Sequence, residues 1–194
     1  MTENLSPQRV FLFSGHMIDR ADRPKPRFPP EREAAVTATL AAQLGRLQAD
    51  ARDLGICGGA CGGDLIFAEC ILASGARLDV YLPFEPEVFV RESVDFADAN
   101  WRERFDAVRA HERARTFVLG ATRTEDERNA SPYERNNLWM LERALAGGAP
   151  KVHFLCVWDG KPGDGPGGAG HMVKAVEASG GTAEPPIDPL GSAG

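Results

Sequence analysis

A glycine-rich turn in the first third of the chain constrains its fold more than any other feature. Residues 55–64 read Gly-Ile-Cys-Gly-Gly-Ala-Cys-Gly-Gly-Asp, with four glycines within residues 58–63. A short apolar segment at 54–57 leads into this turn, and helix-forming residues at 65–73 follow it. The sequence therefore predicts a strand, a tight turn and a helix in succession.

Two interpretations of this turn remain open. Glycines allow backbone N–H groups to come close to a ligand, and the start of the following helix favours a phosphate or carboxylate. On that interpretation the ligand contacts Gly58, Gly59, Gly62, Gly63 and Asp64. On the other, the glycines only permit a tight turn capped by Asp64, and no ligand binds there.

The composition narrows the class of protein. The chain has 194 residues, 43% hydrophobic and 26% charged, which suits a single globular domain with its own core. Its net charge of -6 argues against nucleic acid as a partner. No apolar run reaches the ~20 residues of a membrane span, and a signal peptide's order of basic then apolar residues is missing. We expect a cytoplasmic protein without a membrane partner.

The four cysteines indicate neither a metal site nor disulfides. Cys57 and Cys61 flank the glycine turn, while Cys70 and Cys156 lie in apolar segments. The spacing of the first pair matches neither CxxC nor a zinc knuckle, and no histidine is near in sequence. We expect buried free thiols and no metal ion.

Apolar runs and helical periodicity alternate along the rest of the chain. A buried strand is predicted to begin at residue 9, and further strands at 54–57, 77–84, 116–119 and 151–158. Helices are predicted at 31–53, 65–73, 85–114, 132–146 and 172–178. Parallel pairing requires such crossovers, so 54–57 should pair beside the first strand in an α/β fold with a mostly parallel sheet. The expected domain spans 1–180, and 181–194 is a Gly/Pro-rich tail.

Candidate ligand-binding residues follow strand ends, because open α/β sheets bind ligands there. Ser14, Gly15 and His16 end the first strand, and Asp159 and Gly160 follow the strand at 151–158. Residues 19–30 combine four basic residues with four prolines and exclude regular structure. This segment is either a plain surface loop or a basic flap over the ligand site.

The helix predicted at 132–146 carries a second group of candidates. Ser131 is the expected N-cap, with Pro132 in the first turn. Tyr133, Arg135 and Asn136 cluster in that turn, where helix ends bind anions. The expected core stripe of this helix consists of Leu138, Leu141 and Leu145.

Three segments together resemble a known superfamily. They are Ile-Cys-Gly-Gly-Ala-Cys-Gly-Gly-Asp at 56–64 followed by Val-Tyr-Leu-Pro at 80–83, Tyr-Glu-Arg-Asn-Asn-Leu-Trp-Met at 133–140, and the glycine loop at 158–171. Their order over most of 9–178 is similar to the LOG/DprA-like (SLOG) Rossmannoid superfamily, and above all to LOG-type, "lysine decarboxylase-like" nucleotide phosphoribohydrolases. The resemblance implies a Rossmann-like three-layer sandwich, a bacterial source, a homodimer, and a nucleotide phosphate on the later loop at Gly160, Gly167, Gly168, Gly170 and His171.

One departure from that family bears on activity. The phosphoribohydrolases carry Pro-Gly-Gly-x-Gly-Thr followed closely by a catalytic Glu, whereas this chain has His171 in place of Thr and no acid before Glu177. Cleavage of an N-glycosidic bond needs a carboxylate. The resemblance therefore favours a non-catalytic, sensor-like member.

Three hypotheses follow. The first is a domain that binds a nucleotide or phosphosugar without a cofactor, with Arg135 and Asn136 on ribose or phosphate oxygens. The second is a nucleoside monophosphate or N-riboside hydrolase, with Arg135 and Asp159 as candidate catalytic residues and Asp64 or Glu134 as other replacements for the missing acid. The third is an interaction protein whose glycine loops only pack.

Overall fold

A six-stranded sheet forms the centre of the protein, in a computed structural model that describes residues 6–97, 100–120, 130–161 and 168–191. All strands are parallel, in the order β4-β3-β2-β1-β5-β6. Their bounds are β1 Val10–Gly15, β2 Leu54–Cys57, β3 Arg77–Leu82, β4 Ala114–Val118, β5 Val152–Val157 and β6 Thr182–Ala183. The predicted pairing of 54–57 with the first strand is confirmed.

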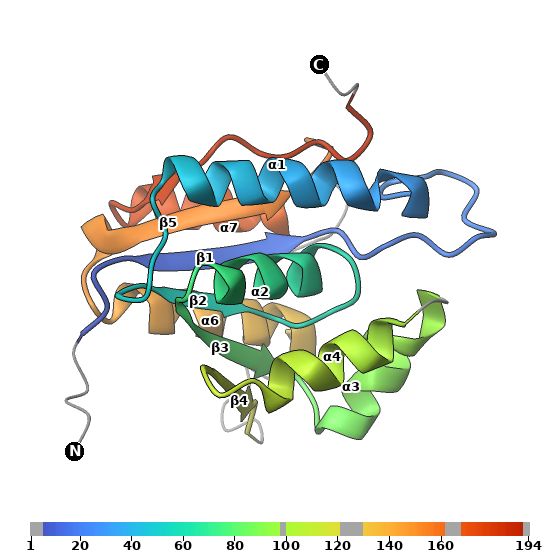
Figure 1. The fold of residues 1–194 in the computed structure, drawn as a ribbon, viewed down its shortest axis with the longest axis horizontal. Coiled ribbons are helices and arrows are strands. Elements are labelled where there is room, and N and C mark those ends of the chain that lie inside the picture. The colour runs from blue at the N-terminus through green and yellow to red at the C-terminus, as the bar shows by residue number, and fades with distance from the viewer. Residues whose placement is uncertain (1–5, 98–99, 121–129, 162–167, 192–194) are drawn as a thin grey trace.

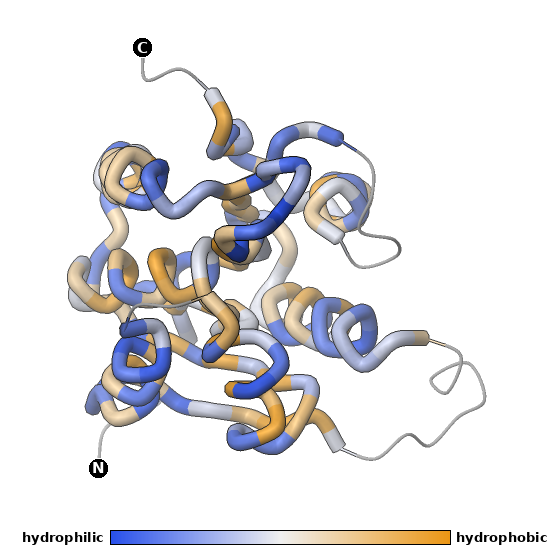
Figure 2. Tube along the Cα trace, turned by 90° about the vertical axis from the view of Figure 1, so that its right-hand side faces the viewer, coloured by the Kyte–Doolittle hydropathy of each residue, from blue (hydrophilic) through white to orange (hydrophobic). Residues whose placement is uncertain are grey.

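Helices cover both faces of this sheet and complete three layers (Figures 1 and 2). On one face lie α1 Glu33–Arg46, α2 Gly63–Ala73 and α4 Trp101–Ala110, with α3 Pro86–Ser93 beside α4. On the other lie α6 Pro132–Leu145 and α7 Ala169–Ala178. Short 3₁₀ helices occur at Pro30–Arg32, Asp95–Ala97 and Ala149–Lys151. The predicted Rossmann-like α/β sandwich is confirmed.

Strand β1 is buried on both faces, which explains its continuous apolar run. Phe11 and Phe13 point into the core under α1 and α2, whereas Val10 and Leu12 point into the core under α6 and α7. The Phe13 ring stacks on Phe67 of α2 with centroids 4.8 Å apart. The central strand therefore links both halves of the hydrophobic core.

The helix predicted at 31–53 is shorter than expected and ends at Arg46. Gln48 has a left-handed backbone conformation with φ of +54°, and a right-handed helix cannot continue through such a residue. The Arg9 guanidinium donates hydrogen bonds to the carbonyl oxygens of Leu47 and Gln48 and pairs with buried Asp53. The side chain of Arg9, the residue before β1, thus donates to the carbonyl oxygens that follow the helix end.

The prediction of a single helix at 85–114 is wrong, because this segment forms two separate helices, α3 and α4. Val94, fully buried, leaves the helical conformation with φ of −129°. The break lets both pieces bury aromatic side chains, with Phe89 of α3 and Phe105 of α4 in contact at 5.8 Å between ring centroids. Trp101, the first residue of α4, is also buried.

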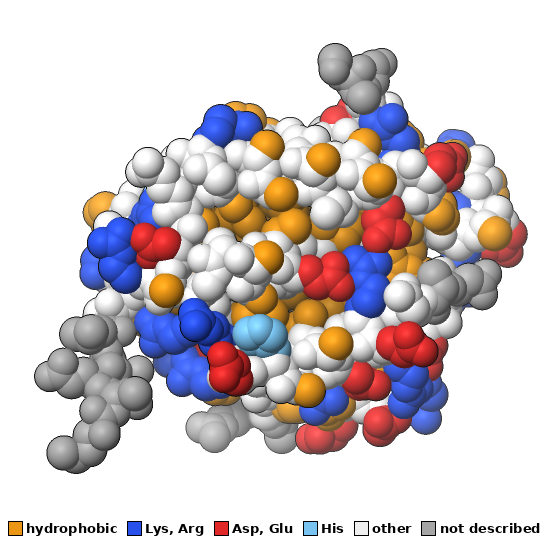
Figure 3. All heavy atoms as spheres, in the orientation of Figure 1, with side chains coloured by type: hydrophobic (Ala, Val, Ile, Leu, Met, Phe, Trp, Pro, Cys, Tyr) orange, Lys and Arg blue, Asp and Glu red, His pale blue; other side chains and the backbone are white. Residues whose placement is uncertain are grey.

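One arginine ties together the helices on this face. Arg104 of α4 pairs with Glu33 of α1 at 2.6 Å and with Glu69 of α2 at 2.7 Å. Its guanidinium also lies 3.9 Å from the Trp101 ring centroid. Figure 3 shows acidic and basic side chains adjoining on this face, with hydrophobic side chains between the helices. The network fixes how α1, α2 and α4 lie against one another.

Helix α6 has the predicted start but a different buried face. Leu138, placed in the core stripe by sequence, is 40% exposed, so that assignment is wrong. Leu141 of the predicted stripe is buried, as expected, together with Asn136, Met140 and Ala144. Asn136 donates a hydrogen bond to the Tyr81 carbonyl oxygen at 2.8 Å, which fixes this rotation.

Replacing Ser131 with alanine should lower the free energy of unfolding by about 1 kcal/mol. The Ser131 hydroxyl accepts a hydrogen bond from the Glu134 backbone N–H at 3.1 Å, as expected of an N-cap. Urea denaturation measures the change. Ser131→Asp, which preserves the acceptor, should stay near wild type, and equal losses in both variants would contradict the capping role.

The C-terminal residues reach the edge of the sheet. Thr182 and Ala183 pair with His153 and Phe154 of β5, and buried Ile187 forms a bridge to Val157. Within the described residues, no helix has the length and apolar character needed to cross a membrane.

Candidate functional site

The direction in which strands are added to the sheet reverses between β1 and β5, at the centre of the sheet. From β1 the chain adds β2, β3 and β4 on one side and then returns to place β5 on the other. Open α/β sheets bind ligands at such a switch point, beyond the carboxyl ends of the strands. Ser14 and Gly15 lie at this end of β1, opposite Cys156 and Val157 of β5. Figure 2 looks onto this edge of the molecule.

Three polar side chains meet at the switch point. His16 Nε2 lies 3.2 Å from Asp159 Oδ1 and 3.2 Å from Arg27 Nη2. Arg27 Nη2 lies 4.0 Å from Asp159 Oδ1. The His16 and Asp159 side chains are each 5% exposed, and Arg27 is 22% exposed. The cluster joins a residue following β1, a residue following β5 and the basic loop between β1 and α1.

Asp159 is held as a carboxylate. Burial alone would raise the pKa of Asp159, but hydrogen bonds from the Lys161 backbone N–H and from His16, with the charge of Arg27, lower it overall. The contact with the carboxylate orients the imidazole ring. The Asp159 backbone N–H also approaches His16 Nε2, at 3.3 Å.

The loop at 19–30 is closed at its base by Asp19. Asp19 Oδ2 accepts hydrogen bonds from the backbone N–H groups of Arg27 and Phe28, at 2.7 and 2.8 Å. Phe28 is fully buried, which anchors the end of the loop in the core. Arg27 is thereby held beside His16 and Asp159. Lys25 of the same loop is exposed.

Three backbone N–H groups of the glycine turn donate hydrogen bonds within the protein. Gly63 N donates to the His16 carbonyl oxygen at 3.0 Å, Cys61 N to that of Ser93 at 2.9 Å, and Ala60 N to Asp64 Oδ2 at 3.2 Å. A β-bridge joins Gly62 to Met17. The segment after β1 therefore lies directly on the turn that the sequence indicated as a phosphate cradle.

Asp64 lies buried beneath that turn. Burial raises the pKa of Asp64 to about 7, although the Ala60 N–H hydrogen bond favours the charged form. A Cβ atom at Gly58 would lie 2.9 Å from Asp64 Oδ2, and one at Gly59 2.9 Å from Val80 Cγ1. The absence of a side chain at Gly58 and Gly59 therefore leaves room for the side chains of Asp64 and Val80.

The candidates on α6 lie at the ends of β3 and β4. Asn136 is buried on the Tyr81 carbonyl, and its Oδ1 atom lacks a hydrogen-bond partner among the described residues. Tyr133 shares a hydrogen bond with Ser93 at 2.9 Å, and Arg135 donates to the Gly120 carbonyl oxygen at 3.2 Å. None of these contacts joins them to His16 or Asp159.

The later glycine loop reaches the switch point through α7. Gly168 is the N-cap of α7, and the Gly170 backbone packs against the Trp158 ring, just before Asp159. His171 lies in the first turn, and Gly160, with φ of +73°, follows Asp159. Gly167 lies outside the described residues. The start of α7 thus lies beside the end of β5.

The four cysteines are free thiols whose surroundings favour the protonated form. Cys57, Cys61 and Cys156 are buried and unpaired, as predicted, whereas Cys70 is half-buried. Burial raises the pKa of Cys61 and Cys156 to about 12 each and that of Cys70 to about 11. Within the described ranges, no group of three His, Cys, Asp or Glu side chains could hold a metal ion.

Sequence reasoning did not single out Arg27 or Asp19 as site residues. Arg27 was one of four basic residues in the loop, and nothing local distinguished it from Lys25. The signal was Phe28, an aromatic residue between prolines and charges, because an apolar anchor in a polar loop fixes its neighbours.

Comparisons with known proteins add little to this geometry. No protein-family model matches the chain, and a search of curated proteins finds no match. A search of solved structures finds DNA processing protein A (DprA) from Streptococcus pneumoniae, at 12% identity and a TM-score of 0.37. The match covers 95% of this chain and 60% of that chain. We draw no conclusion about ligand or activity from a match at this TM-score.

Proposed function

We propose that this protein binds a nucleotide or another small phosphate-bearing molecule at the switch point between β1 and β5. The observation that carries the proposal is the meeting of His16, Arg27 and Asp159 at that point. The Arg27 guanidinium offers N–H donors, and a guanidinium suits the paired oxygens of a phosphate. The sequence resemblance to nucleotide-binding SLOG domains points the same way.

The surroundings of the cluster support an anionic ligand. The start of α7 lies next to Trp158, so its partial positive charge is directed to the same edge of the sheet. Trp158, half-buried beside Gly170, offers an aromatic surface of the kind on which a base stacks. The glycine turn at 58–63 supports the segment that carries His16, because Gly63 N donates to the His16 carbonyl oxygen and Gly62 forms a bridge to Met17.

Replacing Arg27 with glutamine should weaken ligand binding about tenfold, because one charge-assisted contact to phosphate is lost. The measurement is a thermal-shift titration with nucleoside mono- and diphosphates, cyclic nucleotides, NAD, ADP-ribose and ribose 5-phosphate. Lys25→Gln is the matched control, since it removes the same charge from an exposed position of the same loop. A ligand at a hundred times its Kd should stabilise wild type by about 2.7 kcal/mol.

Each outcome of this screen decides the proposal. Stabilisation that weakens in Arg27→Gln and persists in Lys25→Gln supports binding at the switch point. Equal weakening in both variants would reflect a general charge effect and contradict the assigned position. No shift with any ligand at millimolar concentration would refute nucleotide binding and leave the third hypothesis, a protein that functions through protein contacts.

The hydrolase alternative rests on a separate observation, the contact between His16 and carboxylate Asp159. Such a pair can activate water or protonate a leaving group. Chromatography of the same mixtures tests it: free base should accumulate with wild type and not with Asp159→Asn. Intact ligand after prolonged incubation would exclude this reaction for that ligand while leaving binding intact.

A further inference from the structure

A groove runs between helix α1 and the C-terminal segment that follows β6. Figure 1 shows this segment passing along α1. The α1 groove has a volume of about 590 Å³, within the range of roughly 300–1,000 Å³ that is usual for small-molecule sites. On the helix side, its lining residues recur at steps of three or four positions and therefore share one face: Arg32, Ala35, Thr39, Gln43 and Arg46.

The opposite wall of the α1 groove is held in place by hydrogen bonds. Gln43 Nε2 donates to the Pro185 carbonyl oxygen at 3.0 Å, and Arg32 Nε donates to that of Pro189 at 2.9 Å. The segment thus runs antiparallel to α1, with Pro185 beside the last turn of the helix and Pro189 beside its start. The backbone of Ile187 is hydrogen-bonded to the end of β5. A wall fixed in this way loses little conformational entropy when a ligand binds.

Two polar groups of α1 have unused hydrogen-bonding capacity in the groove. Gln43 is 3% exposed, and its Oε1 atom is buried without a hydrogen-bond partner among the described residues. Such an acceptor is destabilising until a donor reaches it, and the broad terminal torsion of a glutamine lets its oxygen turn toward a ligand. The exposed Arg46 guanidinium forms no ion pair or hydrogen bond within the described part of the chain.

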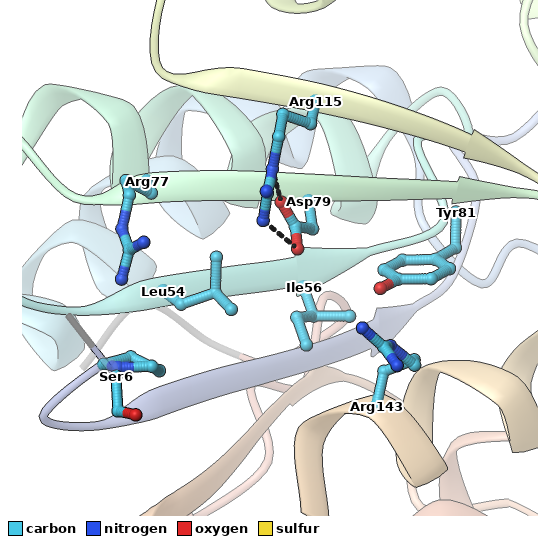
Figure 4. Close-up of a pocket in the computed structure, with 9 residues that line it drawn as sticks. Ser6, Leu54, Ile56, Arg77, Asp79, Tyr81, Arg115 and Arg143 are labelled. Atoms are coloured by element: carbon cyan, nitrogen blue, oxygen red, sulfur yellow. Dashed lines mark hydrogen bonds and ion pairs between the residues drawn. The ribbon is translucent and has the colours of Figure 1, made fainter. Parts of the chain in front are cut away.

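The pocket at the starts of β2 and β3 differs, because its charged side chains are already partnered (Figure 4). Arg115 donates two hydrogen bonds to Asp79, Nε to Oδ1 at 2.9 Å and Nη2 to Oδ2 at 3.0 Å. Arg143 hydrogen-bonds the Tyr81 side chain, and Arg77 also has a partner. We therefore assign no ligand to that pocket.

We propose that the α1 groove binds an N-acyl amino acid. Its carboxylate pairs with Arg46, its amide N–H donates to Gln43 Oε1, and its acyl chain lies over the buried apolar lining residues Val36 and Ile187. An arginine binds a carboxylate through two N–H groups. Residues three apart on a helix have Cβ atoms about 5–6 Å apart, which matches a ligand whose carboxylate and amide N–H are joined by one carbon atom.

The charges along the groove set the direction of the ligand. Asp188, the only carboxylate among the described lining residues, precedes Pro189 and so lies toward Arg32, at the opposite end from Arg46. The ligand carboxylate avoids repulsion by Asp188 when the acyl chain points toward the start of α1. The 14 residues of α1 measure about 21 Å, which is longer than an amino acid carrying an extended eight-carbon acyl chain.

The α1 groove is distinct from the proposed nucleotide site. Its unpaired polar groups belong to α1, whereas His16 and Asp159 lie beyond the carboxyl ends of β1 and β5. Binding in the groove therefore does not rest on the function proposed above, and Arg27→Gln should leave it unchanged.

The test is titration calorimetry with N-octanoylglycine. Its methyl ester, which lacks the negative charge, should bind about tenfold more weakly. Octanoyloxyacetic acid, which has an ester oxygen in place of the N–H, should bind about three- to tenfold more weakly. Arg46→Gln should weaken binding of the acid about tenfold and leave binding of the methyl ester unchanged. Arg91→Gln, which removes the same charge from an exposed position on α3, should match wild type.

Amide chemical-shift mapping by NMR locates the ligand, and circular dichroism checks that both variants are folded. Shifts at residues 35–46 and 187–188, with a loss of affinity in Arg46→Gln alone, support the α1 groove. Equal affinity for the acid and its methyl ester, equal losses in Arg46→Gln and Arg91→Gln, or no binding at millimolar ligand would overturn it. Binding of a longer peptide without binding of N-octanoylglycine would also overturn it and indicate a protein contact instead.

Discussion

Gly62→Ala is expected to destabilise the protein by about 3 kcal/mol or more. Gly62 has φ of +89° and ψ of −125°, a conformation that L residues with a side chain rarely adopt. A Cβ atom there would lie 2.4 Å from the Ile18 backbone N and 2.9 Å from the Met17 carbonyl carbon. Backbone atoms cannot move aside like a flexible side chain, so the segment after β1 must separate from the turn.

Denaturant unfolding of Gly62→Ala beside Gly45→Ala measures this effect. Gly45 lies inside α1 with no atom within 4 Å of an added Cβ, so alanine there should stabilise the helix by about 0.5–1 kcal/mol. The two glycine substitutions should thus change stability in opposite directions. A Gly62→Ala protein as stable as wild type would show that the turn and the 16–18 segment do not pack as described.

The same variant bears on the meaning of the glycine turn. A ligand cradle would lose affinity with little loss of stability, whereas a packing turn loses stability first. Because Gly62 and Gly63 contact the segment that carries His16, the turn acts on the switch point through the position of that segment.

The sequence was sufficient to predict the alternation of strands and helices, but not the contact between the glycine turn and the segment after β1. Continuous burial of β1 and the strand–turn–helix at 54–73 follow from local patterns, and both are confirmed. That His16 O would accept a hydrogen bond from Gly63 N depends on residues 47 positions apart in the chain, which no local pattern encodes. The same holds for Arg27, whose role depends on the return of β5 beside β1.

The error on α6 has a similar origin. Helical periodicity gives the spacing of apolar residues, and two stripes on α6 satisfied it. A buried polar contact, Asn136 to the Tyr81 carbonyl oxygen, decided between them. Periodicity ranks a polar residue as outward-facing, so it selected the stripe that contains exposed Leu138.

Asp64→Asn is expected to stabilise the protein at pH 8 by up to about 4 kcal/mol and to have little effect near pH 4. Burial raises the pKa of Asp64 from 3.8 to about 7 in the folded state. The folded protein therefore retains a proton that the unfolded chain loses above pH 4. The resulting stability is fully present below about pH 4 and is lost as the pH rises through about 7.

Urea unfolding of both proteins from pH 4 to pH 8 tests this linkage. Asparagine keeps an oxygen that accepts the Ala60 N–H hydrogen bond and has almost the same size, so cavity and strain contributions stay small. Asp106→Asn, at an exposed position of α4, removes the same charge and serves as the control. A difference between Asp64→Asn and wild type that stays constant with pH would show that Asp64 is solvated in the folded protein. A difference that grows between pH 4 and pH 8 would establish a carboxyl group buried beneath the glycine turn that gains and loses its proton near neutral pH.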